Sequence, residues 1–314
     1  MTWKPIVAGV DGSPESLRAA ALAWRIARPA DARCILVYAV PEIWAPGGVA
    51  PLVYSPDIFD RLAADVRRLL AEELGDEVPA EVREALVARA GRPGVVLAEV
   101  AQERGAELLV VGGRHHGALA RSWGGSTAHH LVRTVDIPVL VAGPGRQIPE
   151  RVLAAVDVFE GAAPTLTAAA RYAGLLGARL RVVHVMEPAR FPTVVPLSID
   201  ETAYGARARQ AFERLVDAAA PVVTGPDRVT RRGLADEGIA EEAAAWEADV
   251  TVLGSHGKGW LNRMLIGSTT ERLLNRLPTS LLVVPVLRPA RRRPVRAGRA
   301  RKRRASGPKG RVVL

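Results

Sequence analysis

Short apolar runs alternate with longer amphipathic or Ala-rich stretches along the whole chain. In the N-terminal half, the runs expected to form strands are Ile6–Val10, Arg33–Val40, Val82–Val87, Leu108–Val111 and Val139–Ala142. They are apolar on both faces, as parallel strands buried beneath helices are. The first helix between them has a clear start, because Ser13 is a good N-cap and Pro14 suits the first helical position. Alternating strands and helices predict a doubly wound parallel sheet with right-handed crossovers.

The C-terminal half repeats this pattern. Its expected strands are Val152–Val156, Leu180–Val185, Val229–Leu234, Val250–Leu253 and Ser280–Val284. Residues 109–142 align directly with residues 251–284, at an offset of 142 positions. The aligned pairs include Gly112 with Gly254, Gly125 with Gly267, and Ser126 with Ser268. A repeat of this length predicts two tandem domains at residues 1–144 and 145–287, joined near the breaker Gly143-Pro144-Gly145.

The basic charge of the chain lies in its last residues. Of the 43 Lys and Arg residues, 12 fall within residues 288–314, which contain no Asp or Glu. The rest of the chain carries 31 basic and 33 acidic residues, so its net charge is about −2. The Arg, Pro and Gly content of residues 288–314 predicts a disordered basic tail. Charge alone predicts nonspecific polyanion contact, and the lack of aromatic residues argues against sequence-specific single-strand recognition.

Cysteine content and hydropathy place further limits on the class of protein. Cys34 is the single cysteine, which excludes an intramolecular disulfide, and its apolar surroundings predict a small core residue. The N-terminal residues show no signal-peptide pattern, and no run of 18 apolar residues exists. We therefore expect a cytoplasmic protein without a membrane span.

The candidate chemistry lies at strand ends, where ligands bind in open parallel sheets. Asp11 and Asp157 follow the first strand of each half, and a glycine loop follows each fourth strand. Glycines let a backbone approach phosphate, and a helix N-terminus favours an anion. In the second half these positions are Ala155, Asp157, Gly254, Ser255, His256, Gly257, Lys258, Gly267, Ser268 and Thr269. Together they predict a nucleotide site, with the base over the first two strands and the phosphates on the loop.

The first half carries the corresponding residues with local departures. They are Gly9, Asp11, Gly112, Gly113, Arg114, His115, His116, Gly117, Gly125, Ser126 and Thr127. His115 replaces the middle glycine of the loop, although Gly113 or Gly117 could re-route the backbone. Conversely, the second half has Ala155 in place of Gly9 and lacks the Gly12-Ser13 that follows Asp11. Each half therefore departs from the common motif at a different position.

The order of these landmarks in both halves resembles that of the universal stress protein family, over about residues 5–143 and 150–286. The resemblance implies two tandem flavodoxin-like, Rossmann-like α/β domains. Each would have a five-stranded parallel sheet, order 3-2-1-4-5, with helices on both faces. It also implies bound ATP, with or without Mg, and packing through the last strand as a homodimer or an intrachain pseudo-dimer. Val185 matches a position that the family places beside adenine, and Ala39 is its first-half counterpart.

Other site chemistries find little support. The Gly257-Lys258 pair lacks the remaining residues of a Walker A motif. His115, His116, His129 and His130 do not have metal-ligand spacing, since adjacent residues do not share a helix face. No general base or metal-binding acidic pair is visible near the loop, so we expect a regulatory protein in which ATP hydrolysis, if any, is slow.

Three plainer interpretations stay open. The glycines and the two aspartates can serve as turn or cap residues only. The chain can be a stress-family scaffold that has lost nucleotide binding and acts through an unknown regulatory protein partner. It can also be a polyanion-associated protein that works through the basic tail.

Overall fold

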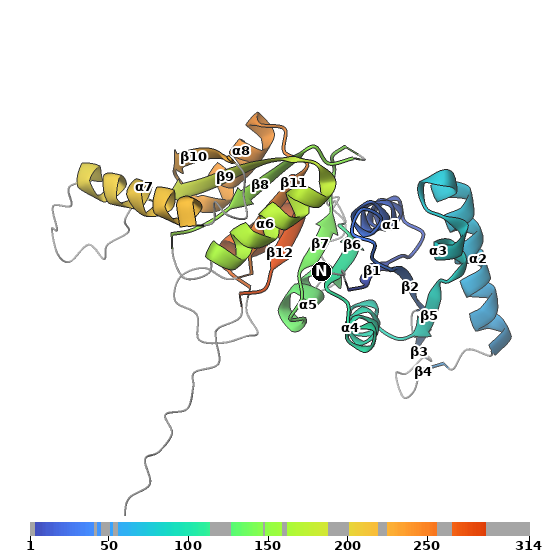
Figure 1. The fold of residues 1–314 in the computed structure, drawn as a ribbon. Helices are drawn as coiled ribbons and strands as arrows, with labels where there is room; N and C mark the ends of the chain where they lie inside the picture. Colours follow the sequence, from blue (N-terminus) through green and yellow to red (C-terminus); the bar gives the residue numbers. More distant parts are fainter. Residues whose placement is uncertain are drawn as a thin grey trace, which may run out of the picture.

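A ten-stranded sheet forms the centre of the molecule in the computed structural model (Figure 1). The structure describes residues 4–40, 43–44, 51–52, 56–113, 127–146, 148–158, 162–187, 201–218, 225–255 and 266–286. The strand order is β10-β9-β8-β11-β12-β7-β6-β1-β2-β5. The first half supplies the last five strands of this series and the second half supplies the first five.

The first half forms a sheet of order β5-β2-β1-β6-β7 in which every neighbouring pair is parallel. Its elements are β1 (Ile6–Gly9), α1 (Pro14–Ala27), β2 (Cys34–Val40), β3 (Ile43–Trp44), β4 (Pro51–Leu52), α2 (Pro56–Leu74), a 3-10 turn (Gly75–Glu77), α3 (Ala80–Glu84), β5 (Val87–Ala90), α4 (Pro93–Arg104), β6 (Leu108–Gly112), α5 (Thr127–Thr134) and β7 (Val139–Ala142). The expected order 3-2-1-4-5 is confirmed. The small antiparallel pair β3–β4 follows β2.

The second half repeats this arrangement as β10-β9-β8-β11-β12, again with parallel neighbours. Its elements are β8 (Arg151–Ala155), α6 (Ala162–Leu176), β9 (Arg179–Met186), α7 (Glu201–Ala218), β10 (Asp227–Arg232), α8 (Ala235–Ala245), β11 (Val250–Gly254), α9 (Ser268–Arg276) and β12 (Ser280–Val284). The doubly wound α/β fold expected for both halves is therefore confirmed.

The two halves join through their last strands within one chain. Strands β7 and β12 pair antiparallel, with Leu282 opposite Leu140 and Leu281 opposite Val141. Figure 1 shows these strands at the seam between the halves. Because the strands of each half are parallel and the seam is antiparallel, the carboxyl ends of the two halves emerge at opposite edges of the sheet.

Two continuous apolar cores run across the seam, one on each face of the sheet. Helices α1, α2, α6 and α7 cover one face, where Ile26, Leu70, Leu166 and Phe212 are buried. Helices α4, α5, α8 and α9 cover the other face with the second cluster of buried residues. Helices on both faces hide the central strands, which explains why these strands are apolar on both sides.

The third strand of each half differs from the sequence expectation. The segment Val82–Val87 was expected to be a strand, but residues 80–84 form α3 and the strand begins at Val87. Val82 and Leu86 both pack on the core, and this i, i+4 spacing suits a helix. Strand β10 spans Asp227–Arg232 rather than Val229–Leu234, because the chain turns at Gly233 with a φ of 135°.

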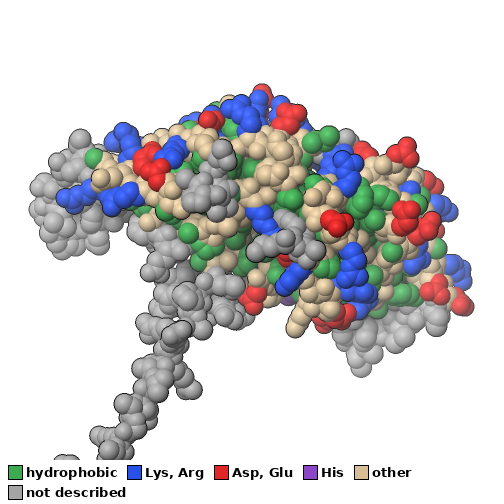
Figure 2. All heavy atoms as spheres, in the orientation of Figure 1, with side chains coloured by type: hydrophobic (Ala, Val, Ile, Leu, Met, Phe, Trp, Pro, Cys, Tyr) green, Lys and Arg blue, Asp and Glu red, His purple; other side chains and the backbone are tan. Residues whose placement is uncertain are grey.

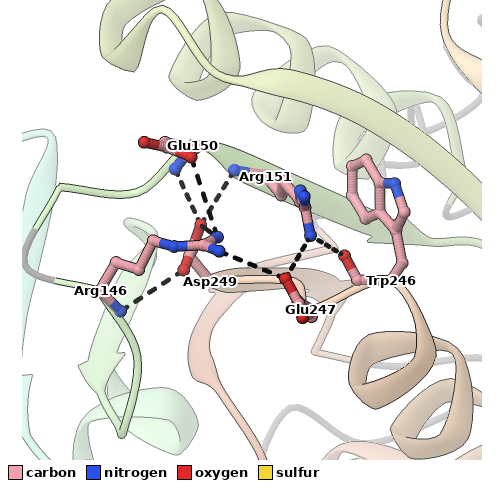
Figure 3. A network of polar contacts seen from close by, with 6 residues as sticks. All are labelled: Arg146, Glu150, Arg151, Trp246, Glu247 and Asp249. Carbon is pink, nitrogen blue, oxygen red and sulfur yellow. Dashed lines mark hydrogen bonds and ion pairs between the residues drawn. The ribbon is translucent and has the colours of Figure 1, made fainter.

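A polar network anchors the connection between the halves (Figure 3). The buried Asp249 carboxylate accepts the backbone N–H groups of Glu150 at 2.8 Å and Arg151 at 3.1 Å. The Arg151 guanidinium donates to the Glu247 carboxylate at 2.8 Å, and Arg146 donates to it at 3.2 Å. These hydrogen bonds lower the pKa of Glu247 below its usual range. The residues that lead into β8 are thereby held against the amino end of β11.

The surface of the described residues carries mixed charge. Figure 2 shows Lys and Arg side chains interspersed with Asp and Glu over the visible face. The described part of the chain contains no helix that is long and apolar enough to cross a membrane. Residues 288–314, expected to be a disordered tail, lie outside the described residues.

Candidate functional site

The candidate residues gather where the strand order reverses. In the first half β1 lies between β2 and β6, and in the second half β8 lies between β9 and β11. The chain leaves the carboxyl ends of these neighbouring strands in opposite directions, which opens a crevice for ligands. The described candidates at these strand ends and helix starts are Gly9, Asp11, Ala39, Gly112, Gly113 and Thr127 in the first half, and Ala155, Asp157, Val185, Gly254, Ser255, Gly267, Ser268 and Thr269 in the second.

The middle parts of both glycine loops fall outside the described residues. These predicted positions are Arg114, His115, His116, Gly117, Gly125, Ser126, His256, Gly257 and Lys258. For them the interpretation from the sequence stays a prediction.

Asp11 takes part in the turn that starts α1. Its Oδ1 accepts the Ser13 N–H at 3.0 Å and also the Ser13 hydroxyl, while Gly12 adopts a φ of 81°. Ser13 Oγ accepts the Ser16 N–H at 3.3 Å, so Ser13 is the N-cap, as predicted. The Asp11 N–H donates to Ser16 Oγ at 3.1 Å. One carboxylate oxygen of Asp11 is therefore already bonded within the turn.

Ser16 was missed by the sequence analysis although it completes this turn. Its side chain is buried and its hydroxyl donates to the Ser13 carbonyl at 2.9 Å. A second serine three residues after an N-cap serine was the available signal.

Glycines at the strand ends of the first half allow close packing. A Cβ added to Gly112 would lie 2.7 Å from the backbone C of Glu15 and the backbone N of Ser16. A Cβ added to Gly9 would lie 2.8 Å from Leu97 Cδ1. A side chain at Gly112 would meet backbone atoms, whereas one at Gly9 would have to displace the Leu97 side chain. The absence of a side chain at Gly112 therefore lets the start of α1 and the end of β6 come together at the carboxyl edge of the sheet.

In the second half the N-terminus of α9 points its backbone donors out of the helix. Gly267 is the N-cap and makes no side-chain cap hydrogen bond. The first-turn N–H groups, which include those of Ser268 and Thr269, have no partner inside an α-helix. Ser268 is exposed and Thr269 is partly exposed. This geometry presents donors and the positive end of a helix dipole at the carboxyl edge of the sheet.

A short set of hydrogen bonds holds this helix start against β11. The Gly267 N–H donates to the Ser255 carbonyl at 2.9 Å, and Thr270 Oγ1 donates to the Gly254 carbonyl at 2.9 Å. The Val286 N–H donates to Ser255 Oγ at 3.1 Å. The donors of α9 are therefore preorganised relative to the strand. Thr270 was not predicted, since a threonine in a first helical turn is common and nothing in its spacing singles it out.

The flank of α9 is fixed by a buried carboxylate. Asp236, near the start of α8, is 2% exposed and accepts Arg272 Nη1 at 3.0 Å, with Arg276 Nη1 at 3.6 Å. The two arginines stand one turn apart on α9, so one carboxylate fixes the rotation of the helix about its axis.

In the second half, the part of the site that is predicted to bind the nucleotide base lies at the end of β9. A Cβ added to Gly238 would lie 3.0 Å from Val185 Cγ1, so α8 packs closely behind Val185. Glu187 Oε1 accepts the Ala235 N–H at 3.1 Å and thereby caps the same helix. Ala155 is buried. Val185 and Ala155 are thereby held in place and form an apolar surface beside the strand ends.

A metal centre is not built into the part of the chain that the structure describes. There, no group of three or more His, Cys, Asp or Glu side chains lies close enough to hold an ion. His130, one of the four clustered histidines, instead packs on Gly94, where an added Cβ would lie 2.6 Å from its ring.

The comparisons with known proteins agree with this geometry. A family model described as the universal stress protein family matches residues 2–143 and 149–285. A universal stress protein of Mycobacterium tuberculosis is 27% identical over 301 residues, which cover 88% of this chain and 96% of the relative. One from Mycolicibacterium smegmatis is 30% identical over 297 residues, which cover 89% and 96%.

Solved structures share the fold over nearly the whole chain. A universal stress protein from Archaeoglobus fulgidus superposes with a TM-score of 0.58 at 19% identity, covering 90% of this chain and 98% of that one. A functionally unknown protein from Pseudomonas aeruginosa superposes with a TM-score of 0.60 at 20% identity, covering 90% and 93%.

Proposed function

Because the chain belongs to the universal stress protein family, we propose that it binds ATP at the carboxyl edge of its sheet, once in each half. The observation that carries the proposal is the start of α9, where the N-cap Gly267 leaves the first-turn donors without a side-chain cap. Backbone N–H groups at a helix N-terminus bind phosphate without needing a charged side chain. Gly254 and Ser255 supply the strand end on which the loop would close.

The second-half site fits the rest of a nucleotide. Asp157 follows β8 at the switch point, in reach of a ribose, and Val185 stands where an adenine ring would lie over β9. His256, Gly257 and Lys258 belong to the loop that would approach the phosphates. Ion pairs to Asp236 and the hydrogen bond from Thr270 keep the donors of α9 in place before the ligand arrives.

The first-half site has the same arrangement of strand ends and helix starts, formed by different residues. Gly112 and Gly9 bring β6 and α1 together beneath the crevice, and α5 begins at Thr127. Ala39 occupies the end of β2, where the base would lie. One oxygen of Asp11 is held by Ser13, which orients the carboxylate.

Magnesium would be held mainly by the nucleotide. Mg²⁺ at nucleotide sites keeps several waters and is held by phosphates and one or two carboxylates. The described residues offer no cluster of three acidic or histidine ligands. We also propose a regulatory role, in which bound ATP sets the state of the protein.

Glycine variants test the proposal. Gly257→Val or Gly267→Val should remove ATP binding from the second half and leave the protein folded, because a branched Cβ blocks the backbone from phosphate. Gly174→Val is the control, since nothing lies within 4 Å of a Cβ added there. Isothermal titration with ATP and Mg²⁺ measures affinity, and circular dichroism checks the fold. Unchanged affinity in a variant altered in both halves would favour the scaffold alternative.

A further inference from the structure

His184 is a buried polar residue near the carboxyl end of β9. It directly precedes Val185 and is 6% exposed. Its ring stacks on that of Phe212 in α7, with the ring centroids 5.8 Å apart and the planes at 24°. A buried polar ring is stabilised only when it is hydrogen-bonded, so the partner of His184 indicates its role.

The partner of this ring is the last backbone carbonyl before Asp157. His184 Nδ1 lies 3.0 Å from the Val156 carbonyl oxygen. A carbonyl oxygen only accepts hydrogen bonds, so Nδ1 carries the proton and donates it. The Val156 N–H in turn donates to the Val183 carbonyl at 3.0 Å. Val156 is therefore held to β9 through both of its backbone polar groups.

This hydrogen bond fixes the direction in which the chain leaves β8. The Val156 carbonyl belongs to the planar peptide unit that also contains the N–H and the Cα of Asp157. Because the oxygen is held, the plane is fixed and the position of the Asp157 Cα is restricted. Asp157 is partly exposed, so a ligand at the switch point can reach it.

The first half restrains the corresponding aspartate in a different way. By the registers of β1–β2 and β8–β9, Tyr38 is the first-half counterpart of His184. Tyrosine has no polar atom at the position of the imidazole Nδ1. Instead, the Asp11 carboxylate accepts the N–H and the hydroxyl of Ser13. The second half lacks the Gly12-Ser13 sequence. The His184 ring and the Ser13 turn thus restrain equivalent strand ends.

We propose that His184 is a positioning residue for the nucleotide site of the second half. By holding the Val156 carbonyl, it places Asp157 where the carboxylate accepts hydrogen bonds from the ribose hydroxyls. This inference rests on the proposed function, in which Asp157 faces the ribose. The first-half site does not depend on His184, because Ser13 restrains Asp11 there.

Paired substitutions separate the hydrogen bond of His184 from the packing of its ring. His184→Phe keeps an aromatic ring against Phe212 and removes the donor. His184→Asn keeps an N–H donor close to the position of Nδ1 and removes the ring. In Gly125→Val, which leaves the second-half site for titration, His184→Phe should weaken ATP binding about tenfold and His184→Asn by no more than about threefold. A packing role predicts the reverse order.

The reciprocal background is the matched control. In Gly267→Val, which leaves the first-half site, His184→Phe should change ATP affinity by less than about twofold. Isothermal titration calorimetry on the full-length chain measures each affinity, and circular dichroism checks that each variant is folded. His184→Gln places its amide one bond farther from the backbone than Nδ1. It should show the same loss as His184→Phe and serves where His184→Phe does not fold.

A nucleotide without ribose hydroxyls tests the route through Asp157. The Gly125→Val protein should bind 2′,3′-dideoxy-ATP more weakly than ATP. With this analogue, His184→Phe should add little further loss, because the contact that His184 positions is already absent. A general weakening of the fold would instead lower the affinity for both nucleotides equally.

Three results would overturn the role of His184 while ATP binding by the parent protein stands. These are unchanged ATP affinity of His184→Phe at the second-half site, a loss in His184→Asn as large as that in His184→Phe, and equal losses for ATP and its dideoxy analogue. A parent protein that binds no ATP overturns the proposed function itself, so the two failures are distinguishable.

Discussion

The layer between the sheet and α4 in the first half is apolar, whereas the same layer under α8 in the second half contains ion pairs. The offset of 142 aligns Val100 with Glu242 and Gly94 with Asp236. The registers of β1–β2 and β8–β9 place Ile35 at the position equivalent to Arg181, since Ile35 lies opposite Val7 and Arg181 opposite Leu153. Val100 and Glu242 are equally buried, at 0% and 3% exposed. One fold thus accommodates both an apolar contact and a charged one at the same positions, provided that every buried charge is paired.

In the charged layer of the second half, the Arg181 guanidinium is paired through its two terminal nitrogens, while its buried Nε has no hydrogen-bond partner among the described residues. Glu242 accepts Arg181 Nη1 at 2.8 Å and Arg231 Nε at 2.6 Å. The Arg181 guanidinium also lies 4.6 Å from the centroid of the Trp246 ring, within cation–π distance. Such a cluster adds little net stability over an apolar contact, yet breaking it leaves desolvated charge behind. The comparison therefore predicts that the second half is the more sensitive to single substitutions at this layer.

The largest expected effect is for Glu242→Val, which copies the first-half residue without its partner. It removes the buried carboxylate shared by Arg181 and Arg231 and leaves Arg181 paired only with the more exposed Asp227 at 3.1 Å, so we expect a loss of about 3 kcal/mol in the free energy of unfolding. Urea unfolding followed by circular dichroism measures it. The double change Glu242→Val/Arg181→Ile copies both first-half residues and should recover most of the loss. A double variant as unstable as the single one would show that the two layers are not interchangeable.

Gly94→Ala tests the apolar side of the comparison. The added Cβ would lie 2.6 Å from His130 Cδ2 and 3.2 Å from His130 Cβ, so α4 and α5 must separate or His130 must turn away. Overpacking of this kind costs about 1–2 kcal/mol, measured by the same urea unfolding. His130→Ala added to Gly94→Ala should restore stability. Should Gly94→Ala prove as stable as the parent, the close contact between these helices would not contribute to the difference between the halves.

Ser13→Ala addresses the helix start that distinguishes the first half. The Ser13 hydroxyl accepts the Ser16 N–H, and its loss should cost about 1 kcal/mol of unfolding free energy. Ser13→Thr keeps the cap and is the matched control. Equal stability of the two variants in thermal unfolding would mean that the turn at Asp11 does not depend on this cap.

The smallest effect concerns Cys34, which stands opposite Ile6 as Leu180 stands opposite Val152 in the second half. Burial raises the pKa of the Cys34 thiol to about 12, so the thiol stays protonated in the folded protein at pH values where it ionises in the unfolded chain. A raised acid pKa means that stability is retained below the unfolded pKa and falls as the pH rises above it. Between pH 8 and pH 9.5 the loss should be about 1 kcal/mol.

The matched protein for this measurement is Cys34→Ala, in which the thiol component of the pH dependence is absent. Urea unfolding of both proteins at pH 8 and pH 9.5 isolates it. The folded parent should also react slowly with iodoacetamide at pH 8, because the thiolate is the nucleophile. Rapid alkylation of the folded protein would contradict the assigned burial.

The sequence was sufficient to predict the fold because its signals were long-range and repeated. Buried apolar strands such as Leu108–Gly112 and Val250–Gly254 were found within one residue, and the offset of 142 located both glycine loops. The exceptions were at the edges of the sheet. Strand β5 was placed too early, because α3 supplies Val82 at helical spacing and an edge strand such as Val87–Ala90 carries a weak apolar pattern.

The sequence predicted where several candidate residues lie in the fold, but not the residues that hold them in place. The strand-end residues Asp11 and Gly254 and the helix start at Ser268 all lie where the sequence placed them. Thr270, through the Gly254 carbonyl, and Asp236, through Arg272, hold the start of α9 in place, and no local motif marks these residues. Their roles depend on which helices pack together in the fold. The hydrophobic periodicity of a single sequence does not reveal those contacts.

The most direct test of the central claim is the stoichiometry of ATP binding to the nucleotide-stripped full-length protein, measured by isothermal titration calorimetry with Mg²⁺. The account predicts two ATP molecules per chain, falling to one in Gly125→Val, to one in Gly267→Val, and to none when both changes are combined. No binding by the parent protein, or two molecules bound by the combined variant, would contradict it.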